Sequence, residues 1–389
     1  MEFKRAQLAN IRNIVEADLS FHPTTNIIFG ENGSGKTSIL EALHIVSLGK
    51  SFRPGRYSTV ITHDSQVARV VAEVETPDIG LQRVGVERHR NGDILARVDG
   101  ENVRSATDLA RRFPILALDD RVFNTLEGGS EARRRLIAWV MFHVKHDYQT
   151  NLSKYRRLSR QRLALLKSDQ TDIEQLRAVD KLLSPVVALI TNTTRQLLST
   201  VAEANKGYVG QKKDVLDPVL YVTFSLSSGF GKVIDEICQN NPDIEVTSDD
   251  IYQAYRDVEQ SDVERGYSNR GINRSDVIFK FNGRRTEHIF SRGQKKRLIV
   301  RFIANLVSVC IKDASIRPVL LLDDISAELD NNRLAELMSE LRDSRVQCFY
   351  TVAGVSSDDL PRAMFQNNHC SMFHVKHGVP TLFHNDQAI

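Results

Sequence analysis

The 389-residue sequence has little cysteine and no long apolar run. Its four cysteines lie far apart and form no C-x-x-C pair, so the pattern indicates neither a disulfide framework nor a zinc knuckle (Cys238, Cys310, Cys348 and Cys370). No stretch approaches the roughly 20 consecutive apolar residues that span a bilayer. The first residues alternate charged and apolar side chains, where a signal peptide has an apolar core. These absences argue against the membrane and secreted classes and predict a protein of the reducing cytoplasm.

The sequence also lacks an overall excess of one charge sign. Its 52 Lys and Arg residues nearly balance 49 Asp and Glu residues, which leaves a net charge of +3. The charges are nevertheless grouped: residues 131–167 hold ten basic and two acidic residues, and residues 265–301 hold eleven and two. Residues 243–264, between these stretches, hold eight acidic residues and one arginine. Basic blocks of this kind are either solvated faces or surfaces for an anionic partner.

The apolar pattern predicts a mixed α/β unit that is interrupted by helices. Short alternating runs predict strands over Phe3–Leu8, Ile14–Phe21 and Asn26–Phe29, and a helix follows over Thr37–Leu48. Further strands are expected over Val60–Glu75 and Leu81–Val98, with a hairpin turn at Asn91-Gly92. Leu- and Arg-rich periodic segments predict helices from Ser130 to about Ala204. The mixed pattern then returns, with expected elements at Val277–Phe281, Arg297–Ile311, Val319–Leu322 and Arg333–Arg342.

A glycine-rich loop provides the first candidate site. Residues 30–37 read GENGSGKT and match G-x-x-x-x-G-K-[ST] between an expected strand and an expected helix, the context that the motif requires. The loop backbone can turn its N–H groups toward a β-phosphate at the helix N-terminus. Lys36 would neutralise β- and γ-phosphate charge, and the Thr37 hydroxyl would bind Mg²⁺. The sequence thus predicts a nucleoside triphosphate site built from the whole loop (Gly30, Glu31, Asn32, Gly33, Ser34, Gly35, Lys36 and Thr37).

An acidic pair after a second buried strand provides the expected metal ligand. Asp323 and Asp324 follow the four apolar residues Val319–Leu322. Asp323 would hold Mg²⁺, and Asp324 would polarise the attacking water. Lys36 and Asp323 are 287 residues apart, more than a compact nucleotide domain needs between these two elements. The spacing predicts that a further domain is inserted between two halves of one site.

A serine- and glycine-containing segment precedes the expected helix Arg297–Ile311. It contains Ser291, Gly293 and Gln294. A serine hydroxyl and a glycine N–H at a helix N-terminus can bind a γ-phosphate, although an N-cap serine would explain such a segment on its own. The position between a P-loop and an acidic strand favours the phosphate-binding interpretation.

Together these motifs resemble the RecF family of the ABC/SMC group of ATPases, along nearly the whole chain. The resemblance rests on the loop, the acidic strand and the serine segment, and on further matches (Arg12-Asn13, SILEALH after Thr37, Gly49–Arg53, Gly128-Gly129, Arg133-Arg134, Trp139, Phe142-His143, Gln161-Arg162, and LLLDDISAELD ending at Asp330). It implies an α/β fold: an ABC-type ATPase head with an inserted, mainly helical second domain. Residues 1–128 and 265–389 would form the head, and residues 129–264 the helical arm.

The resemblance also implies roles for single residues. ATP and Mg²⁺ would be the cofactors, Arg12 and Asn13 would join the nucleotide site, and the serine segment would contact the nucleotide of a second copy. ATP would then hold a homodimer together, with residues 326–330 as a dimer-contact loop. The expected catalytic residues are Lys36, Ser291 and Asp324. The expected DNA contacts come from the first basic block (Arg133, Arg134, Arg156 and Arg160).

The activity implied by the resemblance is that of a weak, DNA-stimulated ATPase of recombinational repair. Such a protein would bind gapped, single-stranded and duplex DNA and would load the recombinase RecA with the RecO and RecR mediators. Two segments depart from the family pattern. In the first, the family usually has Gly-Pro-His before an Arg or Lys, whereas this sequence has Gly271-Ile272-Asn273-Arg274 before Asp276. The second is the lid segment, whose family residues align here with Leu116 and Asp120-Arg121. A different class stays open, an ATP-gated SMC/Rad50-like clamp or regulatory binder without a repair role. A transporter ATPase subunit would need a membrane partner.

One hexapeptide occurs twice. Met141–His146 and Met372–His377 both read MFHVKH, the first in an expected helix and the second in an expected strand. Back-translated as ATG TTT CAC GTG AAA CAT, the hexapeptide is its own reverse complement and resembles the chromosome-partition site bound by ParB. A symmetric DNA-binding dimer recognises a sequence of this kind. Chance and a four-histidine metal site are the competing explanations.

Overall fold

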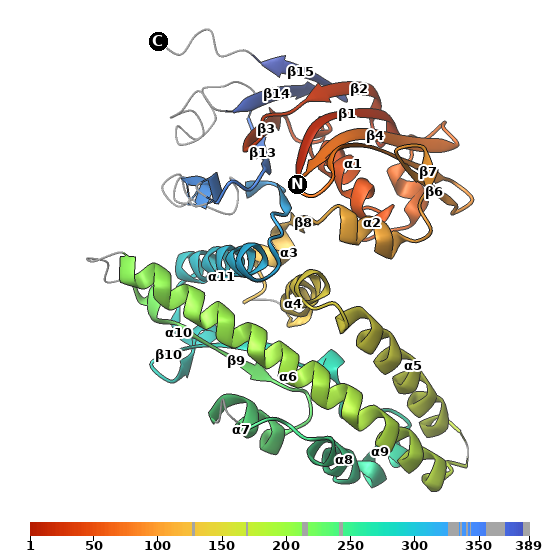
Figure 1. Cartoon of the computed structure of the whole chain (residues 1–389), viewed down its shortest axis with the longest axis vertical. Helices are drawn as coiled ribbons and strands as arrows, with labels where there is room; N and C mark the ends of the chain where they lie inside the picture. The colour runs from red at the N-terminus through yellow and green to blue at the C-terminus, as the bar shows by residue number, and fades with distance from the viewer. Residues whose placement is uncertain are drawn as a thin grey trace. The chain divides into compact units, whose positions relative to one another are not determined.

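The computed structural model describes residues 1–126, 129–168, 170–211, 217–240, 244–325, 334, 337–339, 341–342, 344–354 and 370–383 (Figure 1). Contacts divide the chain into two compact units. The first, here called the head unit, contains residues 1–123 and 310–389. The second, the arm unit, contains residues 124–309.

A mixed six-stranded sheet of the head unit carries the glycine-rich loop and the acidic pair. Its order is β15-β14-β3-β13-β12-β8, with β3 (Thr25–Gly30), β8 (Ile115–Leu118), β12 (Val319–Leu322), β13 (Cys348–Ala353), β14 (Ser371–Lys376) and β15 (Val379–Phe383). The five strands from β14 to β8 are parallel, and only the β14–β15 pair is antiparallel. Strands β3 and β12 are buried along their whole length, as expected for parallel strands covered on both faces. Both end at the carboxyl edge of the sheet, so the two motifs meet there.

A second six-stranded sheet and helix α1 complete the head core. The sheet is antiparallel, in the order β2-β1-β4-β5-β6-β7, with β1 (Glu2–Ile11), β2 (Ile14–Ser20), β4 (Val67–Thr76), β5 (Gly80–His89), β6 (Ile94–Val98) and β7 (Glu101–Asn102). Helix α1 (Lys36–Leu48) contributes apolar residues such as Leu43 to one core cluster with residues of both sheets. Almost every residue of α1 is buried, which is typical of a helix covered on more than one side. This packing fixes the helix whose N-terminus carries the glycine-rich loop.

Short helices connect these elements: η1 (Tyr57–Val60), α2 (Ala106–Arg112) and α3 (Asp120–Phe123). In the part of the chain that the structure describes, no helix is both long and apolar enough to cross a membrane.

The arm unit is mainly helical and contains one small sheet. Its helices are α4 (Glu131–Val144), α5 (Tyr148–Leu166), α6 (Ile173–Gln211), η2 (Pro218–Tyr221), α7 (Lys232–Asn240), α8 (Ser248–Arg256), α9 (Glu259–Arg265), η3 (Ile272–Arg274) and α10 (Thr286–Ile289). The antiparallel sheet has the order β11-β10-β9, with β9 (Thr223–Ser227), β10 (Asp276–Phe281) and β11 (Arg284–Arg285). Helix α11 (Arg292–Ala314) begins in the arm unit and ends in the head unit.

Buried ion pairs connect four arm helices. The guanidinium of Arg162 on α5 donates to Asp180 on α6 at 2.6 Å and to Asp262 on α9 at 2.7 Å. Arg256 on α8 donates to Asp180 at 2.6 Å. Arg162, Asp180 and Asp262 are almost fully buried, so each charge needs the others. Part of the acidic block therefore serves the fold of the arm.

The main expectations about the fold are confirmed: an α/β head unit that carries the glycine-rich loop, interrupted by a mainly helical insertion. The compact units, however, assign residues 265–309 to the arm unit, whereas the sequence placed them in the head. The strand expected from Val60 begins at Val67, because a 3₁₀ turn precedes it, and the helix expected from Arg297 begins at Arg292. The expected dimer-contact loop 326–330, Gly128 and four residues of the expected helix 333–342 (333, 335, 336 and 340) lie outside the described residues.

Candidate nucleotide and DNA sites

The glycine-rich loop is held from its carbonyl side. The side-chain amide of Asn13 donates to the carbonyl oxygens of Gly33 at 3.3 Å and Ser34 at 3.0 Å, and the Gly378 N–H donates to Ser34 at 2.7 Å. In a trans peptide, the N–H that follows a carbonyl points the opposite way. The N–H of Gly35 therefore points away from these braces, toward the side where a phosphate would bind.

Two close approaches require glycine in this region. A Cβ on Gly30 would lie 2.3 Å from the carbonyl oxygen of Val375, and a Cβ on Gly378 would lie 2.0 Å from that of Asn13. Both glycines also have positive φ angles, 153° and 81°, a region that favours glycine. The hairpin between β14 and β15 thus packs directly against the loop, which the sequence motifs did not indicate.

Lys36 points back over the loop. Its ammonium group donates to the carbonyl oxygens of Gly30 and Glu31, both at 2.8 Å. Burial lowers the pKa of Lys36, and the nearby carboxylates of Asp324 and Asp323 oppose this change. The side chain is thus a cation directed by two backbone carbonyls at the N-terminus of α1, where a triphosphate would need positive charge.

The two expected metal ligands lie together. The Thr37 hydroxyl donates to Asp323 Oδ1 at 2.8 Å, and both residues are at the carboxyl edge of the mixed sheet. The Thr351 hydroxyl, at the end of β13, donates to the same Oδ1 at 2.8 Å and accepts the N–H of Asp324 at 2.7 Å. Asp324 is exposed and has a φ of 51°. One threonine on the intervening strand therefore positions both acidic residues.

Arg53 ends the Gly49–Arg53 segment that matches the family, and its side chain contacts the candidate metal ligands. Its guanidinium donates to Thr37 Oγ1 and to Asp323 Oδ2, both at 3.3 Å. Its side chain is 47% exposed. The contacts put a cation against the same two oxygen-bearing side chains that the motif assigns to a metal. The motifs did not indicate the contacts of Arg53 with Thr37 and Asp323, because Arg53 lies outside them, in a loop after α1.

Arg12 forms an ion pair with α1, and its expected contact with a nucleotide stays a prediction. Its guanidinium forms two hydrogen bonds, of 3.0 and 2.8 Å, with the carboxylate of Glu41 on α1. Glu41 is 1% exposed and also accepts from Ser51 at 2.5 Å. Arg12 therefore anchors the end of β1 to α1, and Asn13 beside it holds the loop. In this geometry both expected nucleotide ligands support the site from behind.

The serine segment forms a capping box at the start of α11. The Ser291 N–H donates to the Gln294 side chain at 2.8 Å, and the Gln294 N–H donates to the Ser291 hydroxyl at 3.3 Å. This reciprocal pair satisfies two N–H groups of the helix end. Ser291 and Gly293 are exposed, and no atom of the described residues outside the helix's own backbone lies within 4 Å of a Cβ placed on Gly293. The helix N-terminus thus presents an exposed, compact donor surface.

The four arginines that were expected to contact DNA differ in burial and in hydrogen-bond partners. Arg133 is 4% exposed, and it pairs with Asp276 through two hydrogen bonds of 2.8 and 2.7 Å. This buried ion pair joins α4 to β10, so the prediction of a DNA contact at Arg133 is withdrawn. The guanidinium of Arg134 donates to the Ser275 carbonyl at 2.8 Å and to the Ser130 hydroxyl. Arg156 and Arg160 are exposed on α5.

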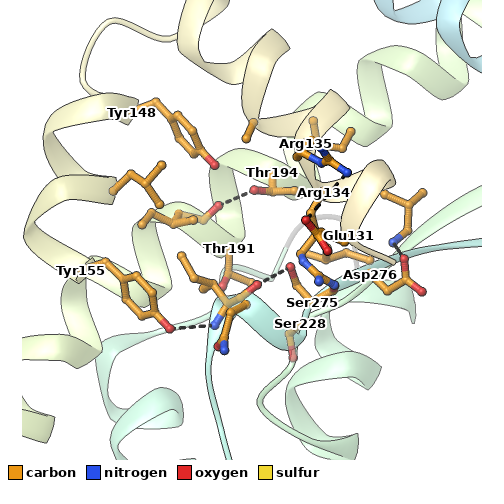
Figure 2. A pocket seen from close by; sticks show the side chains of 18 of the residues that line it. Glu131, Arg134, Arg135, Tyr148, Tyr155, Thr191, Thr194, Ser228, Ser275 and Asp276 are labelled. Atoms are coloured by element: carbon orange, nitrogen blue, oxygen red, sulfur yellow. Dashed lines mark hydrogen bonds and ion pairs between the residues drawn. The ribbon is translucent and has the colours of Figure 1, made fainter. Parts of the chain in front are cut away.

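A cavity of about 310 Å³ lies beside this basic surface, within the arm unit (Figure 2). Helices α4, α5 and α6 line it together with residues 272–277. Figure 2 shows Tyr148, Tyr155, Arg134 and Arg135 around it, and the Tyr155 hydroxyl accepts the Ile272 N–H at 3.2 Å. The segment that departs from the family pattern therefore forms one wall of this cavity.

Comparisons with known proteins agree with this architecture. The family described as "RecF/RecN/SMC N terminal domain" matches residues 2–380. The DNA replication and repair protein RecF of Saccharophagus degradans is 32% identical over 383 residues, covering 97% of this chain and 98% of that protein. The RecF protein of Stutzerimonas stutzeri is 30% identical and covers 100% of both chains.

Solved structures show the same fold at lower identity. A structure described as the recombination mediator protein RecF-ATPrS in the RecFOR pathway has a TM-score of 0.81 and 20% identity, with 98% of each chain covered. An Smc head domain from Pyrococcus furiosus has a TM-score of 0.56 and 15% identity, covering 98% of this chain and 96% of that one. The full-length match to the family and to its curated members therefore shows that the chain belongs to the RecF family.

Proposed function

We propose that this protein is a Mg²⁺-dependent ATPase of DNA replication and repair that dimerises on ATP and binds DNA through its arm. The hydrogen bond between Thr37 and Asp323 carries the proposal, since it places the two motif residues that would hold a metal in one site. The curated relatives are named as DNA replication and repair proteins, and solved neighbours are described with ATP and with its analogue.

The residues present fit a nucleotide and a metal. The Ser34 hydroxyl is buried at the loop and has no hydrogen-bond partner among the described residues, and such an orphaned donor favours a bound anion. Thr37 and Asp323 supply oxygen atoms, the ligands that Mg²⁺ prefers. Bound there, Mg²⁺ would offset charge on the β- and γ-phosphate oxygens. When a nucleotide binds, the Lys36 ammonium group would leave the two backbone carbonyl oxygens that accept its hydrogen bonds and would bind phosphate oxygens.

We assign the water-activating role to Asp324. Its backbone is held by Thr351, while its side chain is at the exposed end of β12. A carboxylate in that position can accept a hydrogen bond from a water and orient its lone pair toward the γ-phosphate. Only one carboxylate then acts on water, because Asp323 is 7% exposed and accepts hydrogen bonds from two threonines. We expect slow hydrolysis that DNA stimulates.

The start of α11 is the proposed dimer contact. Ser291 and Gly293 are exposed at the positive end of a 23-residue helix, where a phosphate of a second copy could bind. Helix α6, the longest of the described helices, has 39 residues, too few for the extended arm of a coiled-coil clamp. We therefore favour a compact ATP-gated dimer over an SMC-like clamp.

The exposed face of α5 is the proposed DNA contact. The helix has no acidic residue, and it exposes Lys154, Arg156, Arg157 and Arg160. Charges of this kind bind the phosphate backbone and carry no base preference by themselves. Gapped, single-stranded and duplex DNA are all candidate ligands. RecO- and RecR-type mediators and a RecA-type recombinase are the proposed protein partners, and the protein would act in the cytoplasm.

Nucleotide binding and turnover test the proposal. Calorimetry should detect Mg²⁺-dependent ATP binding, and hydrolysis should rise when gapped DNA is added. Lys36→Ala should abolish both, because it removes the cation at the loop. Lys312→Ala is the matched control, since Lys312 is exposed in the last turn of α11, and it should behave as the natural protein. If Lys36→Ala binds ATP as tightly as the natural protein and Lys312→Ala do, the proposed site is wrong.

A further inference from the structure

The repeated hexapeptide adopts two different secondary structures. Met141–His146 forms the last residues of α4, which ends at Val144, and then leaves the helix. Met372–His377 forms most of β14 and enters the turn before β15. A duplicated structural unit would keep its fold in both places. The identity of the two copies therefore does not come from a repeated element.

Packing does not require the identity either. Both methionines are buried, at 0% and 3% exposure. Beyond them the environments differ, because inward positions recur every 3.6 residues in a helix and every second residue in a strand. Phe373 and Val375 are 1% exposed in β14, whereas Phe142 and Val144 are half-buried at the end of α4. Identical side chains thus meet different surroundings.

The last histidine of the second copy occupies an unusual position. His377 and Gly378 form the two-residue turn between β14 and β15, where Lys376 pairs with Val379. The φ angles are 46° for His377 and 81° for Gly378. A hairpin turn with two positive φ angles strongly favours Asn, Asp or Gly at its first position. The turn alone would select a different residue here.

The histidines also do not form a metal site in the residues described. The imidazole of His143 packs on Trp139 with ring centroids 4.3 Å apart, and that of His374 stacks on Phe29 at 4.7 Å. Across the described ranges, no group of three or more His, Cys, Asp or Glu residues could hold a metal ion. Each copy uses a histidine in local ring packing instead.

The genetic code supplies a common constraint. The first and last residues, Met and His, have the reverse-complementary codons ATG and CAT. The second and fifth, Phe and Lys, have TTT and AAA, and the central pair, His and Val, has CAC and GTG. All three pairings hold at once, so the six codons can form one uninterrupted palindrome. Selection for protein structure alone would not favour these three reverse-complementary codon pairings in either copy.

We propose that the gene for this chain carries two copies of a two-fold symmetric DNA site, read by a dimeric DNA-binding protein, and that this site dictates both hexapeptides. A symmetric dimer places one reading element on each half of such a palindrome. The fold accommodates both copies because their apolar residues are buried or half-buried, and because each copy ends in exposed residues, His146 in the first copy and Lys376 and His377 in the second. The inference is independent of the proposed ATPase function.

The codons of the two copies give the first test. Both should read as the palindrome, and a codon that breaks the symmetry in either copy would overturn the inference. In mobility shifts with a purified ParB-type partition protein from the same organism, duplexes with the natural codons of each copy should bind. Synonymous recoding to TTC, GTT and AAG should weaken binding about tenfold or more, since each mismatched base pair costs roughly 1–3 kcal/mol. Equal binding of natural and recoded duplexes would refute it.

Variants of the protein provide the second test. His377→Asn, made in the full chain, should keep the thermal midpoint or raise it, because Asn suits the turn better. His146→Ala should leave the thermal midpoint unchanged with and without zinc. A lower midpoint in the first variant, or zinc-dependent stability that the second variant loses, would show that the protein requires these residues and would overturn the DNA-level explanation.

Discussion

Thr37 and Asp323 are 286 residues apart in the sequence, yet the threonine hydroxyl donates a 2.8 Å hydrogen bond to the aspartate. Thr37 lies at the start of α1, after β3 and the glycine-rich loop, and Asp323 directly follows β12; strand β13 lies between β3 and β12 in the sheet. Thr351 at the end of β13 donates to the same carboxylate oxygen. The candidate nucleotide edge therefore takes its oxygen atoms from three parts of the chain: the start of α1 (Thr37), the residue after β12 (Asp323) and β13 (Thr351).

The two acidic residues should give different defects. Asp323→Asn should weaken Mg²⁺-dependent ATP binding, because it removes negative charge from the proposed metal ligand. Asp324→Asn should bind ATP normally but hydrolyse it at least about a hundredfold more slowly, a typical loss when a positioned acid or base is removed. Calorimetry and single-turnover hydrolysis separate the two effects. Equal losses of nucleotide affinity would contradict this division.

Thr351 should matter through its hydroxyl. Thr351→Val keeps the shape of the side chain but removes the donor to Asp323 and the acceptor for the Asp324 N–H. Leaving such buried groups unpaired costs about 1–3 kcal/mol. We expect a lower unfolding free energy and slower hydrolysis, measured by urea denaturation and by steady-state turnover. Thr351→Ser, which keeps the hydroxyl, should restore most of both, and a valine variant as active as the natural protein would exclude the positioning role.

DNA affinity should depend steeply on salt. Each duplex phosphate that the protein neutralises contributes about 0.9 to the slope of log affinity against log salt. The double variant Arg156→Glu and Arg160→Glu should flatten this slope by about 2 or more. Lys232→Glu is the matched control, because Lys232 is also an exposed arm residue, with a side chain that is 90% exposed. An unchanged slope in the double variant would move the DNA contact elsewhere, with Arg284, Arg285 and Lys296 as the next candidates.

The stability of the head unit should fall in mild acid through His44. Burial lowers its pKa from 6.5 to about 4, and its Nδ1–H donates to the Lys50 carbonyl at 2.8 Å. As pH falls below about 6.5, the unfolded chain binds a proton before the folded chain does. The contribution is thus present above pH 6.5 and is lost as pH falls toward 4, by up to about 3 kcal/mol.

Denaturation with urea between pH 4 and 7 measures this effect. His44→Gln should flatten the pH dependence of the unfolding free energy. His63→Gln should leave it unchanged, because the side chain of His63 is 97% exposed. Parallel curves for the natural protein and His44→Gln would show that other groups control the acid response.

The sequence predicted that the glycine-rich loop and the acidic pair lie together, because both motifs are local. The loop Gly30–Thr37 and the acidic pair after Leu322 each follow a short apolar strand, and parallel strands bring their carboxyl ends together. It could not predict Arg53 or Thr351, whose roles depend on strand order and loop path. It misplaced Arg133 because a charge run gives no side-chain burial: the neighbouring carboxylate of Asp276 is 143 residues away in the chain.

ATP-dependent dimerisation can be measured by sedimentation velocity. The protein should be monomeric without nucleotide and with ADP, and dimeric with ATP and Mg²⁺, with gapped DNA favouring the dimer further. Ser291→Arg should bind ATP normally and remain monomeric, since the large side chain would block the start of α11 from a second nucleotide. Arg292→Ser at the next exposed position should still dimerise. Normal ATP-dependent dimers of Ser291→Arg, or dimers that form equally with ADP, would contradict the account.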